Sequence, residues 1–163
     1  MSYDKKEVCP VCRMQVGNNL AGFEYHKTIY VFCSLQCRET FEARPLLYTS
    51  VQSRDHNEVI KSRRIRLIKP LEPELAEAIT EYMQILMGFK ECHTHNRWFT
   101  IRYDLLQLNL VQIERTLNEV GVYFDKSWWH KFWLACLCSM EETELDNLVA
   151  IPSACCNRPP RGV

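Results

Sequence analysis

Four cysteines near the start of the chain constrain its fold more than any other feature of the sequence. Two residues separate Cys9 from Cys12, and three separate Cys33 from Cys37. A short C-x2-C turn can present two thiolates to one ion, and a second pair completes a tetrahedral set that suits zinc. The spacing therefore predicts one structural Zn²⁺ ion held by Cys9, Cys12, Cys33 and Cys37.

The residues around the second pair indicate how it would be positioned. Residues 28–32 are strand-like, and residues 35–43 have the pattern of a helix. Cys33 would then end the strand, and Cys37 would lie in the first helical turn, where the helix dipole favours a thiolate. We expect a treble-clef-like four-cysteine zinc module.

This first segment contains few aliphatic side chains, so it buries too little apolar surface to fold securely alone. A structural zinc ion supplies on the order of 10–16 kcal/mol of apparent binding free energy. We therefore expect the metal to determine whether this module folds.

Composition limits the cellular compartment and the classes of binding partner that we expect for this chain. The 20 acidic and 20 basic residues give a formal net charge of zero, which argues against coating nucleic acid or anionic membrane. No signal peptide and no stretch of roughly 18 apolar residues is visible. The sequence predicts a soluble cytoplasmic protein without membrane insertion, in which nine cysteines favour metal ligation over disulfides.

The chain divides into four segments by composition. Residues 1–48 form the cysteine module, and the polar residues 49–62 are typical of a linker. A second domain is predicted over residues 63–149, where apolar periodicity is regular. Residues 150–163 contain three prolines and are expected to form an irregular tail.

The second domain alternates between strand and helix patterns. Strands are predicted over residues 64–68, 89–94, 98–103 and 122–124, and helices from Pro73 to Gly88 and from Asn109 to Gly121. The order β-α-β-β-α-β is the split arrangement called ferredoxin-like. Together the two domains predict the α+β class.

A further helix is predicted from residue 127 to 140 or beyond, with one broad apolar stripe: Trp129, Phe132, Trp133, Cys136, Leu137 and Met140. Its aromatic group is Trp128, Trp129, Phe132 and Trp133. The stripe fits packing onto the ferredoxin-like domain or onto a second copy of the chain, giving a homodimer. It also fits another protein partner. Acidic residues that follow it argue against a membrane surface.

The first segment resembles the YHS/TRASH class of small metal-binding modules. The resemblance covers about 40 residues, CPVCRMQV and FEYHKTIYVFCSLQCRETFEARPLLY. Such modules occur in copper-exporting ATPases and other proteins that handle heavy metals. Cys9 completes a C-x2-C pair that many YHS members lack, which is closer to four-cysteine zinc fingers, and His26 replaces a usual glycine.

Residues 102–122, RYDLLQLNLVQIERTLNEVGV, resemble the third strand and second helix of heavy-metal-associated domains, the fold of copper chaperones. In that family two cysteines in the loop after the first strand hold the metal. The corresponding residues 69–73 contain no cysteine. The resemblance therefore implies a degenerate domain that has lost its metal or binds it elsewhere.

Other residues could carry a second thiophilic metal. Cys92, His93 and His95 lie close in sequence, although alternation along a strand points Cys92 away from the two histidines. Cys155 and Cys156 are adjacent in the tail. The alternatives are solvated imidazoles for the histidines and oxidative cross-linking for the tail pair.

Two remaining groups have simpler interpretations. Cys136 and Cys138 diverge on a helix, and Cys136 is predicted to be a small core residue. Arg64 and Arg66 share one face of a predicted strand, and this alternation indicates that the face is exposed to solvent. No aromatic interleaving supports nucleic-acid binding there.

No catalytic motif is present, so an enzyme is not expected. The first hypothesis is a cytosolic heavy-metal-handling protein that senses, carries or delivers copper or zinc, with a role in copper homeostasis. The alternative is a zinc-stabilised adaptor for a protein or nucleic-acid partner, without metal trafficking. More than one thiophilic ion per chain would favour the first hypothesis.

Overall fold

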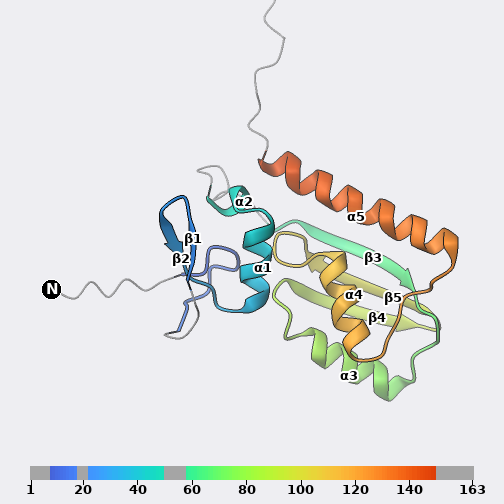
Figure 1. Cartoon of the computed structure of the whole chain (residues 1–163). Helices are drawn as coiled ribbons and strands as arrows, with labels where there is room; N and C mark the ends of the chain where they lie inside the picture. The colour runs from blue at the N-terminus through green and yellow to red at the C-terminus, as the bar shows by residue number, and fades with distance from the viewer. Residues whose placement is uncertain (1–7, 18–21, 50–57, 150–163) are drawn as a thin grey trace, which may run out of the picture.

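The structure is a computed structural model that describes residues 8–17, 22–49 and 58–149. It mixes helices with two antiparallel sheets, which is the predicted α+β class. Figure 1 shows a small N-terminal unit beside a larger unit that contains the three-stranded sheet. We call these the cysteine unit and the sheet unit.

In the cysteine unit, the Cys9–Cys12 turn is followed by a two-stranded hairpin, β1 (Phe23–Tyr25) and β2 (Thr28–Tyr30), and then by α1 (Leu35–Ala43) and α2 (Leu46–Thr49). His26 and Lys27 form the hairpin turn with positive φ angles of 47° and 63°. This turn type favours asparagine and glycine, because most side chains are strained at positive φ. The predicted strand over residues 28–32 ends two residues early, at Tyr30.

Phe41 of α1 is the centre of the small core of the cysteine unit. Its side chain is completely buried. The ring of Phe32 lies 5.2 Å from it and that of Tyr30 4.8 Å, measured between centroids. Five residues of this core are buried: Cys9, Val11, Phe32, Cys37 and Phe41. Two of the five are cysteines, so aromatic packing alone gives this unit little apolar burial.

The sheet of the larger unit contains β3 (Ile60–Arg66), β4 (Phe89–His95) and β5 (Trp98–Asp104) in the order β3-β5-β4. β5 pairs antiparallel with both neighbours, with Ile65 opposite Phe99 and Cys92 opposite Ile101. β3 begins within the range predicted as linker, because Ile60 and Lys61 already pair with the end of β5. The strand predicted over residues 122–124 is reduced to one bridge between Leu67 and Phe124.

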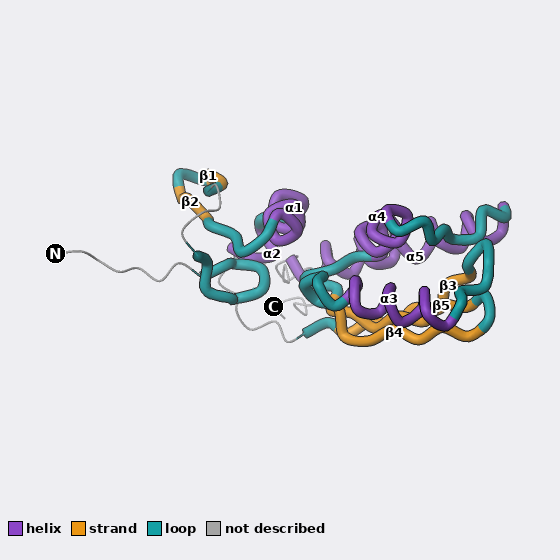
Figure 2. The backbone as a smooth tube through the Cα atoms, turned by 90° about the horizontal axis from the view of Figure 1, so that it is seen from below, coloured by secondary structure: helices purple, strands orange, loops and turns teal. Residues whose placement is uncertain are grey.

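Two helices, α3 (Pro73–Met83) and α4 (Leu110–Glu119), lie on the same side of this sheet (Figure 2). α4 begins with the predicted capping box, in which Asn109 and Gln112 each accept a backbone N–H of the other. α3 ends at Met83, earlier than predicted, and a turn leads to Gly88. The buried core between sheet and helices includes Ile65, Leu67, Ile79, Met83, Phe99, Ile101, Tyr103, Ile113 and Leu117.

The last helix, α5 (Trp128–Val149), is longer than predicted and lies beside β3 (Figure 1). Its buried residues are Leu137, Glu141 and Leu145, spaced four apart on one face. Of the predicted stripe, Leu137 packs into the core of the sheet unit, whereas Trp129 and Phe132 are 72% and 60% exposed, and Trp128 of the aromatic group is 67% exposed. Cys136 is also exposed and not a core residue.

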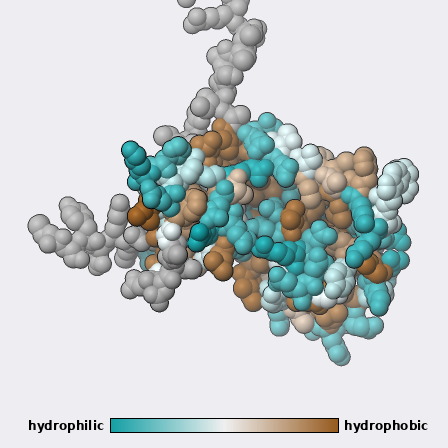
Figure 3. Space-filling model, in the orientation of Figure 1, coloured by the Kyte–Doolittle hydropathy of each residue, from teal (hydrophilic) through white to brown (hydrophobic). Residues whose placement is uncertain are grey.

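The visible surface of both units is mostly hydrophilic with hydrophobic residues interspersed (Figure 3). Among the described residues, no helix combines the length and the apolar character that crossing a membrane requires.

Candidate metal centre

Two chain segments bring the four cysteines together. Cys9 and Cys12 flank a tight turn, in which the Arg13 N–H donates to the Cys9 carbonyl at 2.9 Å and the Cys9 N–H to the Met14 carbonyl at 2.8 Å. An isolated bridge between Val8 and Gln15 closes this turn. The turn holds both thiols at one end of the cysteine unit.

The second pair is fixed by the start of α1. Ser34 is the N-cap of this helix, and its hydroxyl accepts a hydrogen bond from the Cys37 N–H at 3.2 Å. Cys37 therefore lies in the first helical turn, as the sequence predicted. Cys33 directly precedes the cap, so both sulfurs point toward the first pair.

The four Sγ atoms lie within 4.8 Å of one another. Cys12 Sγ is 3.2 Å from Cys33 Sγ, and Cys33 Sγ is 3.5 Å from Cys37 Sγ. Tetrahedral coordination with Zn–S bonds of about 2.3 Å would place the sulfurs about 3.8 Å apart. The donor set and its spacing therefore fit one tetrahedral thiophilic ion, and the residues can hold it with small adjustments.

The thiols do not share the same environment. Cys9 and Cys37 are buried, whereas Cys12 and Cys33 are partly exposed. The Cys37 thiol donates toward Cys9, and this hydrogen bond, with backbone N–H groups, lowers the pKa of Cys9 to about 4. The same interaction raises the pKa of Cys37, and burial raises the pKa of Cys12 to about 12. Without a cation, these interactions favour the thiolate at Cys9 and the neutral thiol at Cys12 and Cys37.

A cation changes this balance, because thiolates are the form that binds zinc and the ion displaces their protons. Because its pKa is lowered, the Cys9 sulfur loses its proton more readily than Cys12 or Cys37 and can give an incoming cation a first ligand. The two partly exposed sulfurs, Cys12 and Cys33, lie on the accessible side of the cluster. The arrangement can bind an ion and hold it with four sulfur ligands.

Residue Gln36, next to Cys37, connects the metal cluster to the sheet unit. Its amide nitrogen donates to the Met87 carbonyl at 2.9 Å and to the Gln107 carbonyl at 3.1 Å. Its amide oxygen accepts from the Met87 N–H at 3.0 Å. One side chain therefore fixes two loops of the sheet unit against the helix that carries Cys37.

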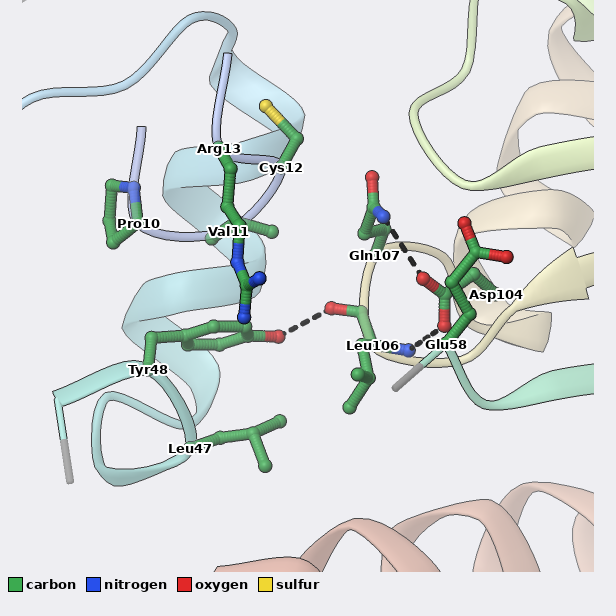
Figure 4. Close-up of a pocket in the computed structure, with 10 residues that line it drawn as sticks. All are labelled: Pro10, Val11, Cys12, Arg13, Leu47, Tyr48, Glu58, Asp104, Leu106 and Gln107. Atoms are coloured by element: carbon green, nitrogen blue, oxygen red, sulfur yellow. Dashed lines mark hydrogen bonds between the residues drawn. The ribbon is translucent and has the colours of Figure 1, made fainter. Parts of the chain in front are cut away.

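A cavity of about 260 Å³ lies between the two units beside the C-x2-C turn (Figure 4). The Tyr48 hydroxyl crosses this boundary and donates to the Leu106 carbonyl at 2.6 Å. Asp104, on the sheet side, accepts from the N–H groups of Val59 and Leu106 and from Gln107. This carboxylate therefore organises the loop after β5.

Among the residues considered for a second metal site, the described ones, Cys92, His93 and His95, are not brought together. The Cys92 side chain is buried against Thr80, with Sγ 3.4 Å from the hydroxyl oxygen. His93 and His95 are exposed on the opposite face of β4, as strand alternation predicted. In residues 8–17, 22–49 and 58–149, the one group with metal-binding geometry is the four-cysteine cluster. Cys155 and Cys156 lie outside the described residues.

Two features of the structure were not predicted. The role of Gln36 in joining the two units could not be predicted from sequence, because a single uncharged residue on a short helix belongs to no recognisable motif. On the open face of the sheet, Arg64 stacks over Trp98 at 4.5 Å from the ring centroid. These residues are far apart in sequence, and the antiparallel register makes them neighbours.

Comparison of the chain with protein-family models, curated proteins and solved structures finds no match.

Proposed function

We propose that this chain is a heavy-metal-handling protein of a reducing compartment such as the cytosol, which binds one thiophilic ion, Zn²⁺ or copper, through Cys9, Cys12, Cys33 and Cys37. The observation that carries the proposal is the convergence of four Sγ atoms within 4.8 Å from two separate segments. Four soft donors suit zinc and Cu(I) over calcium or magnesium, which prefer oxygen ligands.

The small core of the cysteine unit supports a role for the ion in folding. Cys9 and Cys37 are almost completely buried there, so they occupy positions that aliphatic residues would otherwise fill. Binding free energy of a structural ion adds directly to folding free energy. On this account, the YHS/TRASH-like unit is ordered when the metal is bound.

The strand order of the sheet unit supports the proposal that it is a heavy-metal-associated type of domain with a ferredoxin-like arrangement. The order β3-β5-β4, with Phe124 bridged to Leu67 after β3, follows the strand order of that arrangement with a minimal fourth strand. The loop between β3 and α3 lacks cysteine. The metal is therefore assigned to the cysteine unit, and the sheet unit responds to it or contacts a partner.

Gln36 supplies a physical route for such a response. Loss of the ion would release the N-terminal turn of α1, which contains Cys37, and Gln36 lies in that same turn. Its three hydrogen bonds to the loops at Met87 and Gln107 would then weaken. Metal occupancy would in this way alter the sheet unit.

Hydrogen exchange on the full chain tests this coupling. We expect removal of the ion with a chelator to increase amide exchange in α1 and also in residues 84–88 and 105–108, and we expect metal addition to reverse both changes. Amides of β5, in the centre of the sheet, are the internal control. Faster exchange confined to the cysteine unit would contradict metal sensing by the sheet unit.

The second candidate is an adaptor in which the zinc is purely structural. The exposed aromatic residues of α5 favour it, because such surfaces mark interaction sites. Titration with Cu(I) and Zn²⁺ under reducing conditions separates the two candidates. Exchange of the bound ion, or a second equivalent, supports metal handling, and one inert zinc ion supports the adaptor.

A further inference from the structure

A cavity of about 330 Å³ lies where the N-terminal end of α5 meets the sheet. Its lining includes two arginines of β3, one tryptophan of β5 and three residues of α5: Arg64, Arg66, Trp98, Trp129, His130 and Trp133. We call it the arginine–tryptophan cavity. Its volume is at the small end of the range for ligand pockets, about 300–1,000 Å³. The cavity lies within the sheet unit, so its role does not depend on the metal proposed for the cysteine unit.

The pairing of β3 with β5 builds one wall of this cavity. Trp98 lies opposite Arg66, and Arg64 is two residues from Arg66 along β3, so the three side chains share one face of the sheet. Ile65 and Phe99, which alternate with them, are buried on the other face, where α3 and α4 pack (Figure 2). The two arginines and Trp98 therefore project from the face that α3 and α4 leave open.

The short fourth strand lets α5 reach this wall. One bridge, between Leu67 and Phe124, is the only pairing that the described residues make on that edge of β3. The Asp125 N–H then donates to the Arg66 carbonyl at 2.8 Å, and the Ser127 N–H donates to the Asp125 carboxylate at 2.9 Å. α5 begins directly after Ser127. These bonds place the first turns of α5 beside the arginines of β3.

The charges at the cavity are complementary to an anion. No acidic side chain of the described residues lines it, and Arg64 forms no ion pair among them. Stacking over Trp98 holds the Arg64 guanidinium, whose N–H groups lie in its plane and stay available. Arg66 pairs with Asp125 at 3.4 Å, but its side chain is 46% exposed. The positive end of the α5 dipole adds to the same field.

The cavity also presents flat apolar surfaces. Trp129 is 72% exposed and Trp133 is 40% exposed. The His130 ring stacks on Trp133, with 5.6 Å between the centroids and 26° between the planes. Aromatic faces of this kind are the surfaces on which unpaired nucleobases stack. A ligand that uses the whole cavity therefore combines a flat ring with a negative charge.

We propose that the arginine–tryptophan cavity binds one nucleotide of a single-stranded nucleic acid, with the base stacked on Trp129 or Trp133 and the phosphate bound by Arg64 and Arg66. An acidic peptide offers charge without a ring, and a duplex hides its base faces. The sequence shows no aromatic residue near the two arginines, and the fold brings three tryptophans to them. That contact replaces the expectation of a merely solvated strand face.

The rest of the open face favours a strand over a free nucleotide. His95 of β4 lies opposite Trp98, and His93 and Arg102 are exposed on the same face. A chain that leaves the cavity across β5 and β4 therefore meets further stacking and cationic groups. Sheets that carry aromatic side chains are platforms for single-stranded RNA, and arginine adds cation–π contacts to bases.

Fluorescence anisotropy of a labelled single strand of about eight nucleotides, titrated with the full metal-loaded chain, tests the proposal. We expect Trp129→Ala to weaken binding about ten-fold, because a stacking surface is lost. Trp128→Ala is the matched control, because Trp128 is 67% exposed on the same helix but does not line the cavity. No binding by the wild type, or equal losses in the two variants, overturns the proposal.

Arg64→Gln tests the phosphate contact. We expect it to weaken binding about five-fold or more and to lower the salt dependence by about one phosphate contact. Arg115→Gln removes the same charge from α4, on the other side of the sheet, and should leave binding unchanged. An unchanged salt dependence in Arg64→Gln overturns the assignment of the phosphate. Circular dichroism and metal content show that each variant is folded.

Competition identifies the ligand. We expect a duplex of the same sequence and adenosine monophosphate to displace the labelled strand only weakly. A duplex that competes equally overturns base stacking, and adenosine monophosphate that competes equally overturns the extended strand. Phosphotyrosine or anionic phospholipid vesicles that bind at Trp129 when the strand does not would also overturn the proposal. Because metal content is measured separately, each of these failures is distinguishable from failure of the metal proposal.

Discussion

Gln36 and Met87, which are 51 positions apart, exchange two hydrogen bonds across the boundary between the cysteine unit and the sheet unit. The side-chain amide uses both its donor and its acceptor on one backbone residue, at 2.9 and 3.0 Å. A third bond reaches Gln107. Because Cys37 follows Gln36 directly, the metal cluster and the boundary between the units share one helical turn.

Replacing Gln36 by leucine should lower the free energy of unfolding of the metal-loaded protein. The substitution removes three hydrogen bonds and leaves backbone groups of Met87 and Gln107 without partners, at a cost of about 1–3 kcal/mol. Chemical denaturation measures the change. Gln84→Leu is the control, because Gln84 is exposed. Equal stability of the two variants would contradict a role for Gln36 in docking.

Glu141 is a second point where distant segments meet. Its carboxylate is buried on α5 and accepts hydrogen bonds from the Tyr103 hydroxyl and the Leu110 N–H, and it pairs with Arg63 at 3.3 Å. Removing one partner of a buried ion pair leaves an uncompensated charge, which costs about 3–5 kcal/mol. We therefore expect Glu141→Ala to be strongly destabilising in thermal or chemical denaturation.

Glu144 supplies the comparison for Glu141. It forms a shorter ion pair with Lys61, at 2.6 Å, but its side chain is 39% exposed. Water screens such a pair, so Glu144→Ala should cost only about 0–1 kcal/mol. If both alanine variants lost the same stability, burial would not explain the contribution of Glu141.

Stability should also fall at alkaline pH because of Tyr103. Burial, together with the neighbouring Glu141 carboxylate, raises the pKa of the Tyr103 phenol above its ordinary value of about 10. The folded chain therefore holds this proton more tightly than the unfolded chain does. The resulting stability is complete below about pH 10 and is lost as pH rises from there toward the folded pKa.

Denaturant midpoints from pH 8 to pH 11 measure this dependence, with the range set about the ordinary tyrosine pKa. We expect the alkaline decline to be shallower in Tyr103→Phe, which has no phenol to ionise. A decline remains, because burial also raises the pKa of Tyr48. Identical slopes in the wild type and in Tyr103→Phe would contradict the assignment to Tyr103.

Local rules predicted much of this fold. The capping box at Asn109, the hairpin strands of the sheet unit and the position of Cys37 in α1 depend on residues close in sequence, and the structure contains all of them. The fourth strand was overpredicted. Residues 122–124 have strand-like composition, but they form only one bridge.

The orientation of α5 could not be predicted from sequence, because its apolar residues surround the helix. The predicted stripe combines Trp129 and Phe132 with Leu137, whereas the structure buries Leu137 and Leu145 with Glu141 between them. A buried glutamate is tolerated here because Arg63, the Tyr103 hydroxyl and the Leu110 N–H satisfy its carboxylate. That partnership depends on tertiary contacts, and no local pattern indicates it.

The central claim is that Cys9, Cys12, Cys33 and Cys37 hold one thiophilic ion together. Elemental analysis of the full chain, purified under reducing conditions without added metal, tests it most directly when Cys33→Ser is compared with Cys138→Ala, a cysteine outside the cluster. We predict one equivalent of ion in the wild type and in Cys138→Ala, and a loss of most of it in Cys33→Ser. A metal-free wild type, or full retention by Cys33→Ser, would contradict the account.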